Sequence, residues 1–267
     1  MESKSTTSES GMIPSHSTCT LTFGDCAENH VGMEKVGTRA AAGEGFTFAE
    51  MSAMRRAFPG TERIVYDLPS AAGLAGVEPA RVLVIKGGIN HIFGAGYSKA
   101  MLEEQCGLEM DKKALMYKRV VNKKARWNLC FTDGEGHEPA YEEGKGRVVS
   151  YDDVPLLKGL VGRLPELFGE KARDLQGEAN YYYDVSKCGI GYHGDTERRK
   201  VIAVRLGAAM PLVFQWYHRF KKVGPRIDIP LEDGDIYVMS EKAVGCDWKS
   251  SSKYTLRHAA GCAEYTD

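Results

Sequence analysis

The sequence lacks the features of three common protein classes. No two of its seven cysteines have the Cys-x-x-Cys spacing of a zinc ribbon. No stretch approaches the roughly 20 consecutive apolar residues that a membrane-spanning helix needs, so we expect no membrane partner. The formal net charge is only −1, and therefore no global field draws the chain toward nucleic acid. Any nucleic-acid binding would depend on a local basic patch.

Residues 1–45 show little apolar periodicity and are rich in serine, threonine and glycine. We interpret them as a flexible N-terminal tail. Because Met1–Ser10 are polar and no apolar run follows them, we see no secretory signal, and the odd number of cysteines is typical of free thiols. We therefore expect an intracellular protein, of the cytoplasm or the nucleus, with residues 46–267 folded as a single domain.

The two parts of this domain, 46–177 and 178–267, differ in pattern. In the first part, apolar spacing predicts helices near 46–58, 98–110 and 153–168, with strands at 80–86 and 127–131. In the second part, we predict seven short strands at 179–183, 189–193, 201–206, 211–217, 226–231, 236–240 and 254–259. The predicted fold class is therefore α+β, with an all-β second part that is typical of a sandwich or barrel.

The strongest local signal for chemistry is the pair His193 and Asp195. Side chains alternate along a strand with a period of two, so these two would lie on the same face. An imidazole and a carboxylate on one face, joined by a third ligand from a distant strand, form the facial triad of non-haem iron sites. The same pair could instead cap a turn before the charged run Thr196–Lys200.

Five motifs between Ala125 and Ala260 occur in an order and spacing that resemble the AlkB family of nucleic-acid dealkylating dioxygenases. They are Ala125–Asp133, an amphipathic helix from Asp153, Asn180-x-Tyr182, Ile190–Asp195 with its His-x-Asp pair, and Ile229–Ser240. The resemblance covers about half of the chain.

This resemblance implies a double-stranded β-helix, or jelly-roll, core formed by residues 178–267, with flanking helices and the substrate-recognition part in 46–177. It also implies a dioxygenase that uses Fe(II), 2-oxoglutarate and O2 to oxidise, and so demethylate, an alkylated base of DNA or RNA. In the family, the Asn-x-Tyr pair contacts 2-oxoglutarate, which gives this role to Asn180 and Tyr182.

The motifs do not fix the third metal ligand, because Ser250 stands where the family usually has its His. We favour His258, delivered by a longer loop. Alternatively, Arg257 binds the far carboxylate of 2-oxoglutarate from the last strand, and Asp247 is the ligand or there is none. Neighbours on a regular strand face opposite ways, so Arg257 and His258 cannot easily both serve unless a β-bulge intervenes.

Basic residues with interleaved aromatic residues run through the segment 112–127. Such a segment can follow a phosphate backbone and stack a base, although it is also typical of a solvated surface. Within it we assign substrate binding to Lys123, Lys124, Arg126 and Trp127.

Two other functions stay open at this point. The same chemistry could hydroxylate or demethylate a protein side chain or a small molecule, which the near-neutral net charge favours. A catalytically silent binding module, which kept the fold and lost the iron, would account for Ser250. A complete set of three ligands would argue against the silent module, and a basic groove leading to the metal would favour nucleic acid.

Overall fold

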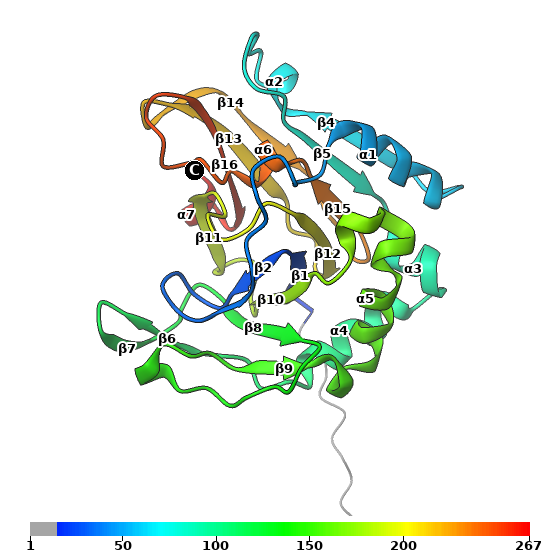
Figure 1. Cartoon of the computed structure of the whole chain (residues 1–267), viewed down its shortest axis with the longest axis vertical. Coiled ribbons are helices and arrows are strands. Elements are labelled where there is room, and N and C mark those ends of the chain that lie inside the picture. Colours follow the sequence, from blue (N-terminus) through cyan, green and yellow to red (C-terminus); the bar gives the residue numbers. More distant parts are fainter. Residues whose placement is uncertain (1–14) are drawn as a thin grey trace, which may run out of the picture.

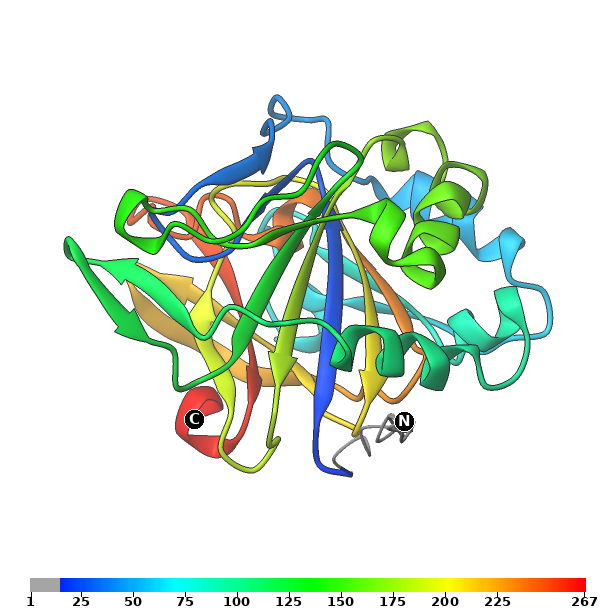
Figure 2. The ribbon, with the colours of Figure 1, turned by 90° about the horizontal axis from the view of Figure 1, so that it is seen from below.

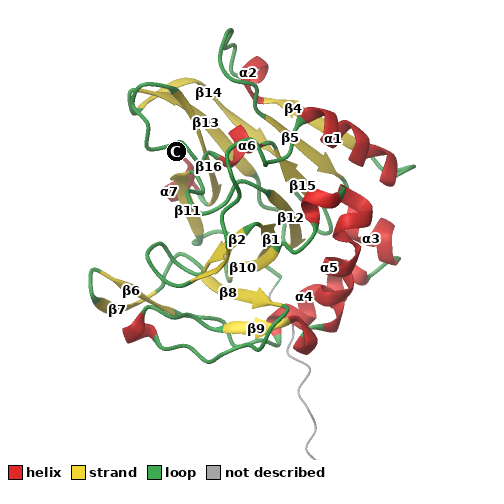
Figure 3. Cartoon of the chain, viewed as in Figure 1, coloured by secondary structure: helices red, strands yellow, loops and turns green. Residues whose placement is uncertain are grey.

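The computed structural model describes residues 15–267, which form two open β-sheets with the longer helices on one side (Figure 1, Figure 3). The larger sheet contains β1 (Thr18–Gly24), β4 (Arg63–Asp67), β5 (Arg81–Ile85), β8 (Trp127–Thr132), β9 (Val148–Ser150), β10 (Gln176–Tyr182), β12 (Val201–Gly207) and β15 (Ile236–Met239). The smaller sheet contains β11 (Gly189–His193), β13 (Leu212–His218), β14 (Lys221–Ile229) and β16 (Tyr254–Gly261).

The remaining elements are short strands and helices. Two separate hairpins pair β2 (Cys26–Glu28) with β3 (Lys35–Gly37), and β6 (Lys113–Met116) with β7 (Arg119–Asn122). The α-helices are α1 (Phe48–Met54), α2 (Leu68–Ala71), α3 (Gly88–Phe93), α4 (Tyr97–Cys106), α5 (Pro155–Phe168), α6 (Glu241–Val244) and α7 (Ala263–Thr266). Within residues 15–267, no helix is both long and apolar enough to cross a membrane.

The strand order of the larger sheet is β4-β5-β15-β12-β1-β10-β8-β9, and that of the smaller sheet is β11-β16-β13-β14. All neighbouring strands are antiparallel except β8 and β9. The fold is therefore mixed α and β, rich in sheet and with few helices, as the sequence predicted.

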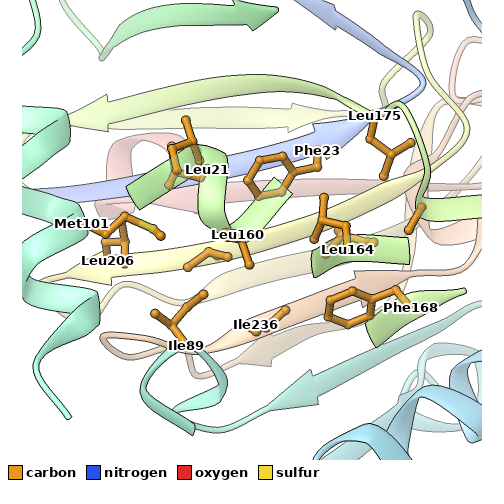
Figure 4. Close-up of a cluster of buried hydrophobic side chains, with 14 of the residues drawn as sticks. Leu21, Phe23, Ile89, Met101, Leu160, Leu164, Phe168, Leu175, Leu206 and Ile236 are labelled. Atoms are coloured by element: carbon orange, nitrogen blue, oxygen red, sulfur yellow. The ribbon is translucent and has the colours of Figure 1, made fainter. Parts of the chain in front are cut away.

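The main hydrophobic core lies between the larger sheet and its covering helices. On β1, Leu21 and Phe23 point to this side because side chains alternate along the strand. Helix α5 contributes Leu160, Leu164 and Phe168, which recur at helical spacing on one face (Figure 4). Burying these side chains fixes the larger sheet against α1, α3, α4 and α5.

A second core lies between the two sheets. Val82 and Val84 of β5, which alternate with the residues that face the helices, pack in one cluster with Phe214 and Trp216 of β13. The inner face of the larger sheet therefore faces the smaller sheet. Near β1 and β10, the side chains on this inner face are polar. These polar side chains line the pocket that contains the candidate site.

The predicted elements after residue 45 are confirmed. The helices expected near 46–58, 98–110 and 153–168 correspond to α1, α4 and α5, and the two expected strands correspond to β5 and β8. The seven strands predicted after residue 178 are β10 to β16. All seven cysteines are free.

The N-terminal segment differs from the expected flexible tail. Strand β1 is buried throughout and pairs with β10 on one side and β12 on the other, so it lies in the middle of the larger sheet (Figure 2, blue). Its sequence, Thr-Cys-Thr-Leu-Thr-Phe-Gly, alternates between Thr and apolar residues, and this alternation is typical of a strand with one polar and one apolar face. The pattern was missed because the surrounding residues are rich in serine and threonine. Residues 1–14 of the expected tail lie outside the described residues.

Candidate metal centre

Three potential metal ligands meet between the sheets. His193 at the end of β11, His258 on β16 and Asp195 just after β11 offer ligand atoms that all lie within 4.8 Å of one another. The Nε2 atom of each imidazole is 3.4 Å from Oδ1 of Asp195. Two imidazoles and one carboxylate on one side of a site are a common ligand set for divalent transition metals. This group could therefore bind a metal ion.

A β-bulge in β11 brings the two histidines together. Ile190 pairs with Ala260, but the register then shifts by one residue, so that His193 lies opposite His258. With an unbroken register, the residue opposite His193 would be Arg257. Because directly opposed side chains lie on the same face of a sheet, the bulge directs His258 toward His193, and their ring centroids are 4.4 Å apart.

The position of Asp195 depends on the close approach of two backbone segments. The backbone N–H of Asp195 donates to the carbonyl of Val244, at the end of α6. A Cβ atom at Gly194 would lie only 2.0 Å from the carbonyl oxygen of Gly245, so a side chain cannot fit there without movement of the backbone. Glycine between the two ligands is therefore what allows the loop to hold Asp195 beside both histidines.

A buried arginine holds the other oxygen of Asp195. Nε of Arg198 is 3.5 Å from Oδ2 of Asp195, and the guanidinium also contacts Glu178 on β10 and Glu197. Burial acts to raise the pKa of Asp195, but the charge of Arg198 holds this pKa well below its ordinary value. Asp195 is therefore a carboxylate, with Oδ1 directed at the histidines.

The two imidazoles present the same nitrogen to the centre. Nδ1 of His193 lies 2.8 Å from the carbonyl oxygen of Gly191, an arrangement that leaves Nε2 for a metal. Burial, together with the nearby His193, lowers the pKa of His258 and so favours the neutral imidazole that metals require.

The pocket that contains this cluster also holds an unpaired buried arginine. Arg205 of β12 is 1% exposed, and it donates from Nη1 to Oγ1 of Thr20 on β1 at 2.6 Å. Its Nε atom has no hydrogen-bond partner, and no carboxylate of the described residues forms an ion pair with it. A buried charge without a counter-ion is strongly unfavourable, so the pocket is suited to an anion that pairs with Arg205.

The residues expected to contact 2-oxoglutarate separate into two groups. Asn180 and Tyr182 of β10 line the pocket, and Oδ1 of Asn180 accepts from Arg126 at 2.7 Å. Arg257 does not line it, because it points to the opposite side of β16 from His258. Its guanidinium instead lies 3.9 Å from the ring centroid of Tyr217.

Asp247, the alternative third ligand, lies outside the cluster. Its Oδ2 atom accepts from Nζ of Lys242 at 2.7 Å. The sequence left three possibilities for the third ligand, which were His258, Asp247 or none. In the structure, His258 is the one that lies beside His193 and Asp195.

The residues expected to bind substrate are also divided. Arg126 lines the pocket, but Trp127 points to the other face of β8 and packs on Tyr181 and Tyr183. Lys123 points inward, where Nζ donates to Asn29 and Asn128, and burial lowers the pKa of Lys123 to about 8. Lys124 is exposed and accepts from Tyr183 through its backbone carbonyl.

Sequence reasoning missed Arg205, Arg198 and Thr20. A signal for Arg205 was present, because a single charge interrupts the apolar run Val201–Leu206. Arg198 is hidden in the charged run after the His-x-Asp pair, where the sequence does not tell a buried arginine from a solvated one. Thr20 could not be found, because its strand was interpreted as tail.

Comparison with known proteins adds one relationship. No family model matches the chain. Over 253 residues, the chain is 45% identical to a protein of Acanthamoeba polyphaga mimivirus named "Uncharacterized protein R156", with 93% of this chain and 97% of the viral protein covered. The chain belongs to the same family as this viral protein. The match extends over almost the whole of both chains, so it includes both sheets.

Proposed function

We propose that this protein is an Fe(II)- and 2-oxoglutarate-dependent dioxygenase that demethylates an alkylated nucleic-acid base, and that its two facing sheets form a double-stranded β-helix of the AlkB type. The observation that carries the proposal is the pairing, in one pocket, of the His193–Asp195–His258 cluster with a buried Arg205 that lacks a counter-ion. A metal centre and an anion-binding arginine are the two parts that a 2-oxoglutarate site needs.

The donor set fits iron. Two neutral imidazoles and one carboxylate match the ligands of non-haem Fe(II) sites, and they leave coordination positions for other ligands. Arg198 would keep Asp195 ionised and restrict it to one metal-binding oxygen, because its other oxygen faces the guanidinium.

The lining of the pocket fits 2-oxoglutarate, which carries a carboxylate at each end. Arg205 and the hydroxyl of Thr20 would bind the carboxylate far from the metal. Asn180 and Tyr182 line the same pocket and would orient the cosubstrate. When bound, iron and 2-oxoglutarate together supply the oxidation of a C–H bond, while the buried side chains around them exclude water.

The mouth of the pocket supports an anionic substrate. Arg126 and the exposed Lys249 contribute to its lining. These groups would attract the phosphates of a nucleotide. The silent binding module is less favoured, because His258 offers the third ligand atom that Ser250 would have left missing.

Anaerobic spectroscopy tests the proposal. Fe(II) and 2-oxoglutarate added to the protein should produce a metal-to-ligand charge-transfer absorbance, and His258→Ala should abolish it. His218→Ala is the matched control, because His218 stacks on Tyr254 at the end of β13 and lies outside the cluster, so this variant should keep the band. If wild type gives no band, the silent module becomes the better explanation. A band that survives in His258→Ala would rule out the assigned ligands.

A further inference from the structure

A series of hydrogen bonds runs from β8 through β10 to the metal ligand Asp195. Nδ2 of Asn128 on β8 donates to Oδ1 of Asn180 on β10 at 2.7 Å, and these two residues are directly opposed in the sheet. Nδ2 of Asn180 donates to Oε1 of Glu178 at 2.9 Å. Oε2 of Glu178 accepts from Nη2 of Arg198, whose Nε lies 3.5 Å from Oδ2 of Asp195. Glu178 therefore joins the amides of the sheet to the guanidinium that holds the metal ligand.

Two cations fix the direction of this series. Arg126 donates from Nε to Oδ1 of Asn180 at 2.7 Å. Lys123 donates from Nζ to Oδ1 of Asn128 at 3.0 Å. Arginine and lysine can only donate hydrogen bonds, so each amide must turn its oxygen toward its cation. The NH2 group of Asn180 is thereby left to face Glu178, which must accept.

The position of Glu178 requires a carboxylate. Its side chain is buried, with the residue 6% exposed, and a buried charge is unfavourable unless its oxygens are bound. Here Asn180 donates to one oxygen and Arg198 donates to the other. A glutamine of the same shape offers one acceptor and one donor, so one of the two bonds would be replaced by two donors that face each other.

Glu197 contacts the same guanidinium without this constraint. Its Oε1 atom accepts from Nε of Arg198 at 3.0 Å and from Nη2 at 2.8 Å. Within residues 15–267, no other side chain donates a hydrogen bond to Glu197. An amide at this position could therefore keep its oxygen on Arg198. The two glutamates bring the same charge to Arg198, but only Glu178 is bound by a fixed donor on its other side.

We propose that Glu178 is a positioning residue for the metal ligand Asp195, oriented by the two cations that lie beyond it. Because Glu178 holds Arg198 on the β10 side, the guanidinium stays at Oδ2 of Asp195 and leaves Oδ1 for the metal. Without this hold, Arg198 keeps only Glu197 and Asp195 as partners, and it competes with the metal for Asp195. The inference rests on the metal centre of the proposed function.

Titration with Co(II), followed by its visible absorbance, tests this role without the cosubstrate, because Co(II) binds the same nitrogen and oxygen ligands. Glu178→Gln should weaken Co(II) binding about 10-fold, since losing a residue that orients a metal ligand typically costs about 10- to 100-fold in metal affinity. The spectrum of bound Co(II) should also change, because the orientation of Asp195 is no longer fixed. Unchanged affinity and spectrum would overturn the inference.

Glu197→Gln is the matched control, because it removes the same charge from the same guanidinium and can keep the hydrogen bond to Arg198. It should weaken Co(II) binding less than Glu178→Gln does. Equal or greater weakening by Glu197→Gln would mean that charge alone, and not the direction of the hydrogen bonds, sets the affinity. That result would also overturn the inference.

The double variant Glu178→Gln/Asn180→Asp keeps the net charge and reverses one hydrogen bond. The amide at position 178 then donates to the carboxylate at position 180 and still accepts from Arg198. The carboxylate at position 180 accepts from Arg126 and Asn128, as the amide does in wild type. This variant should recover most of the Co(II) affinity that Glu178→Gln loses. Failure to recover would contradict a role for Glu178 through its hydrogen bonds.

The outcome is separable from that of the proposed function. If Co(II) binding follows these expectations but Fe(II) and 2-oxoglutarate give no charge-transfer absorbance, the role of Glu178 stands and the dioxygenase is contradicted. If that absorbance is present and Glu178→Gln binds Co(II) as wild type does, the reverse holds. Absence of Co(II) binding by wild type would contradict both.

Discussion

The two faces of the larger sheet carry different side chains on the same strands. On β1, Cys19, Leu21 and Phe23 face the helices, while Thr20 and Thr22 face the pocket. Strands β10 and β12 repeat this division. On β10, Ala179 and Tyr181 face the helices, whereas Glu178, Asn180 and Tyr182 line the pocket. On β12, Ile202, Val204 and Leu206 face the helices, whereas Arg205 lines the pocket.

This contrast separates stability from chemistry. The helix-covered face buries apolar area, which is the main favourable contribution to folding. The pocket face buries charged groups that are favourable only while their partners are present, as Arg198 is with Glu178. Replacing a residue on the helix-covered face should therefore change only the stability of the protein. The effect of replacing a residue on the pocket face should depend on which charged partner is lost.

The largest change in stability is expected from Phe23→Ala on the helix-covered face. Phe23 is fully buried in the main core, and its removal leaves a cavity that should lower the free energy of unfolding by about 4 kcal/mol. Denaturant unfolding measures the loss. Iron titration below the unfolding transition should give the wild-type affinity. A weakened affinity would show that the two faces are not independent.

A smaller loss, about 3 kcal/mol, is expected from Arg198→Met on the pocket face, because Asp195, Glu178 and Glu197 would keep their buried charges without a counter-charge. Denaturant unfolding again gives the magnitude. Adding Glu178→Gln to this variant should recover part of the loss, since it removes one of the unpaired carboxylates. No recovery would mean that packing of the arginine, rather than charge, accounts for its effect.

The smallest change in stability is expected from Arg205→Met, which should alter the free energy of unfolding by less than about 1 kcal/mol or raise it, because it removes a buried charge that has no counter-ion. Affinity for 2-oxoglutarate, measured anaerobically in the presence of metal, should fall about 100-fold. Arg257→Met should leave this affinity unchanged. The opposite ranking of these two variants would restore Arg257 as the carboxylate-binding residue.

Much of the fold was predictable, because its signals are local. Apolar spacing gave α5, and alternation between short β runs and turns gave the strands β10 to β16. The segment that failed, β1, was misinterpreted because its strand pattern covers only seven residues in polar surroundings. A strand in the middle of a sheet is recognised by its neighbours, β10 and β12, which are distant in sequence.

The candidate site divides in the same way. The sequence by itself indicated the pair His193 and Asp195, but Asp195 lies just after β11, and its place beside His193 depends on a loop that packs closely against Gly245. Tertiary structure alone decided between His258 and Arg257, since one bulged residue in β11 sets which of them faces His193. It also decided that Arg205 is buried without a counter-ion, because that depends on every strand packed around it. Local periodicity fixes the direction of a side chain along its own strand, whereas its partners across the sheet depend on a register that only the folded chain sets.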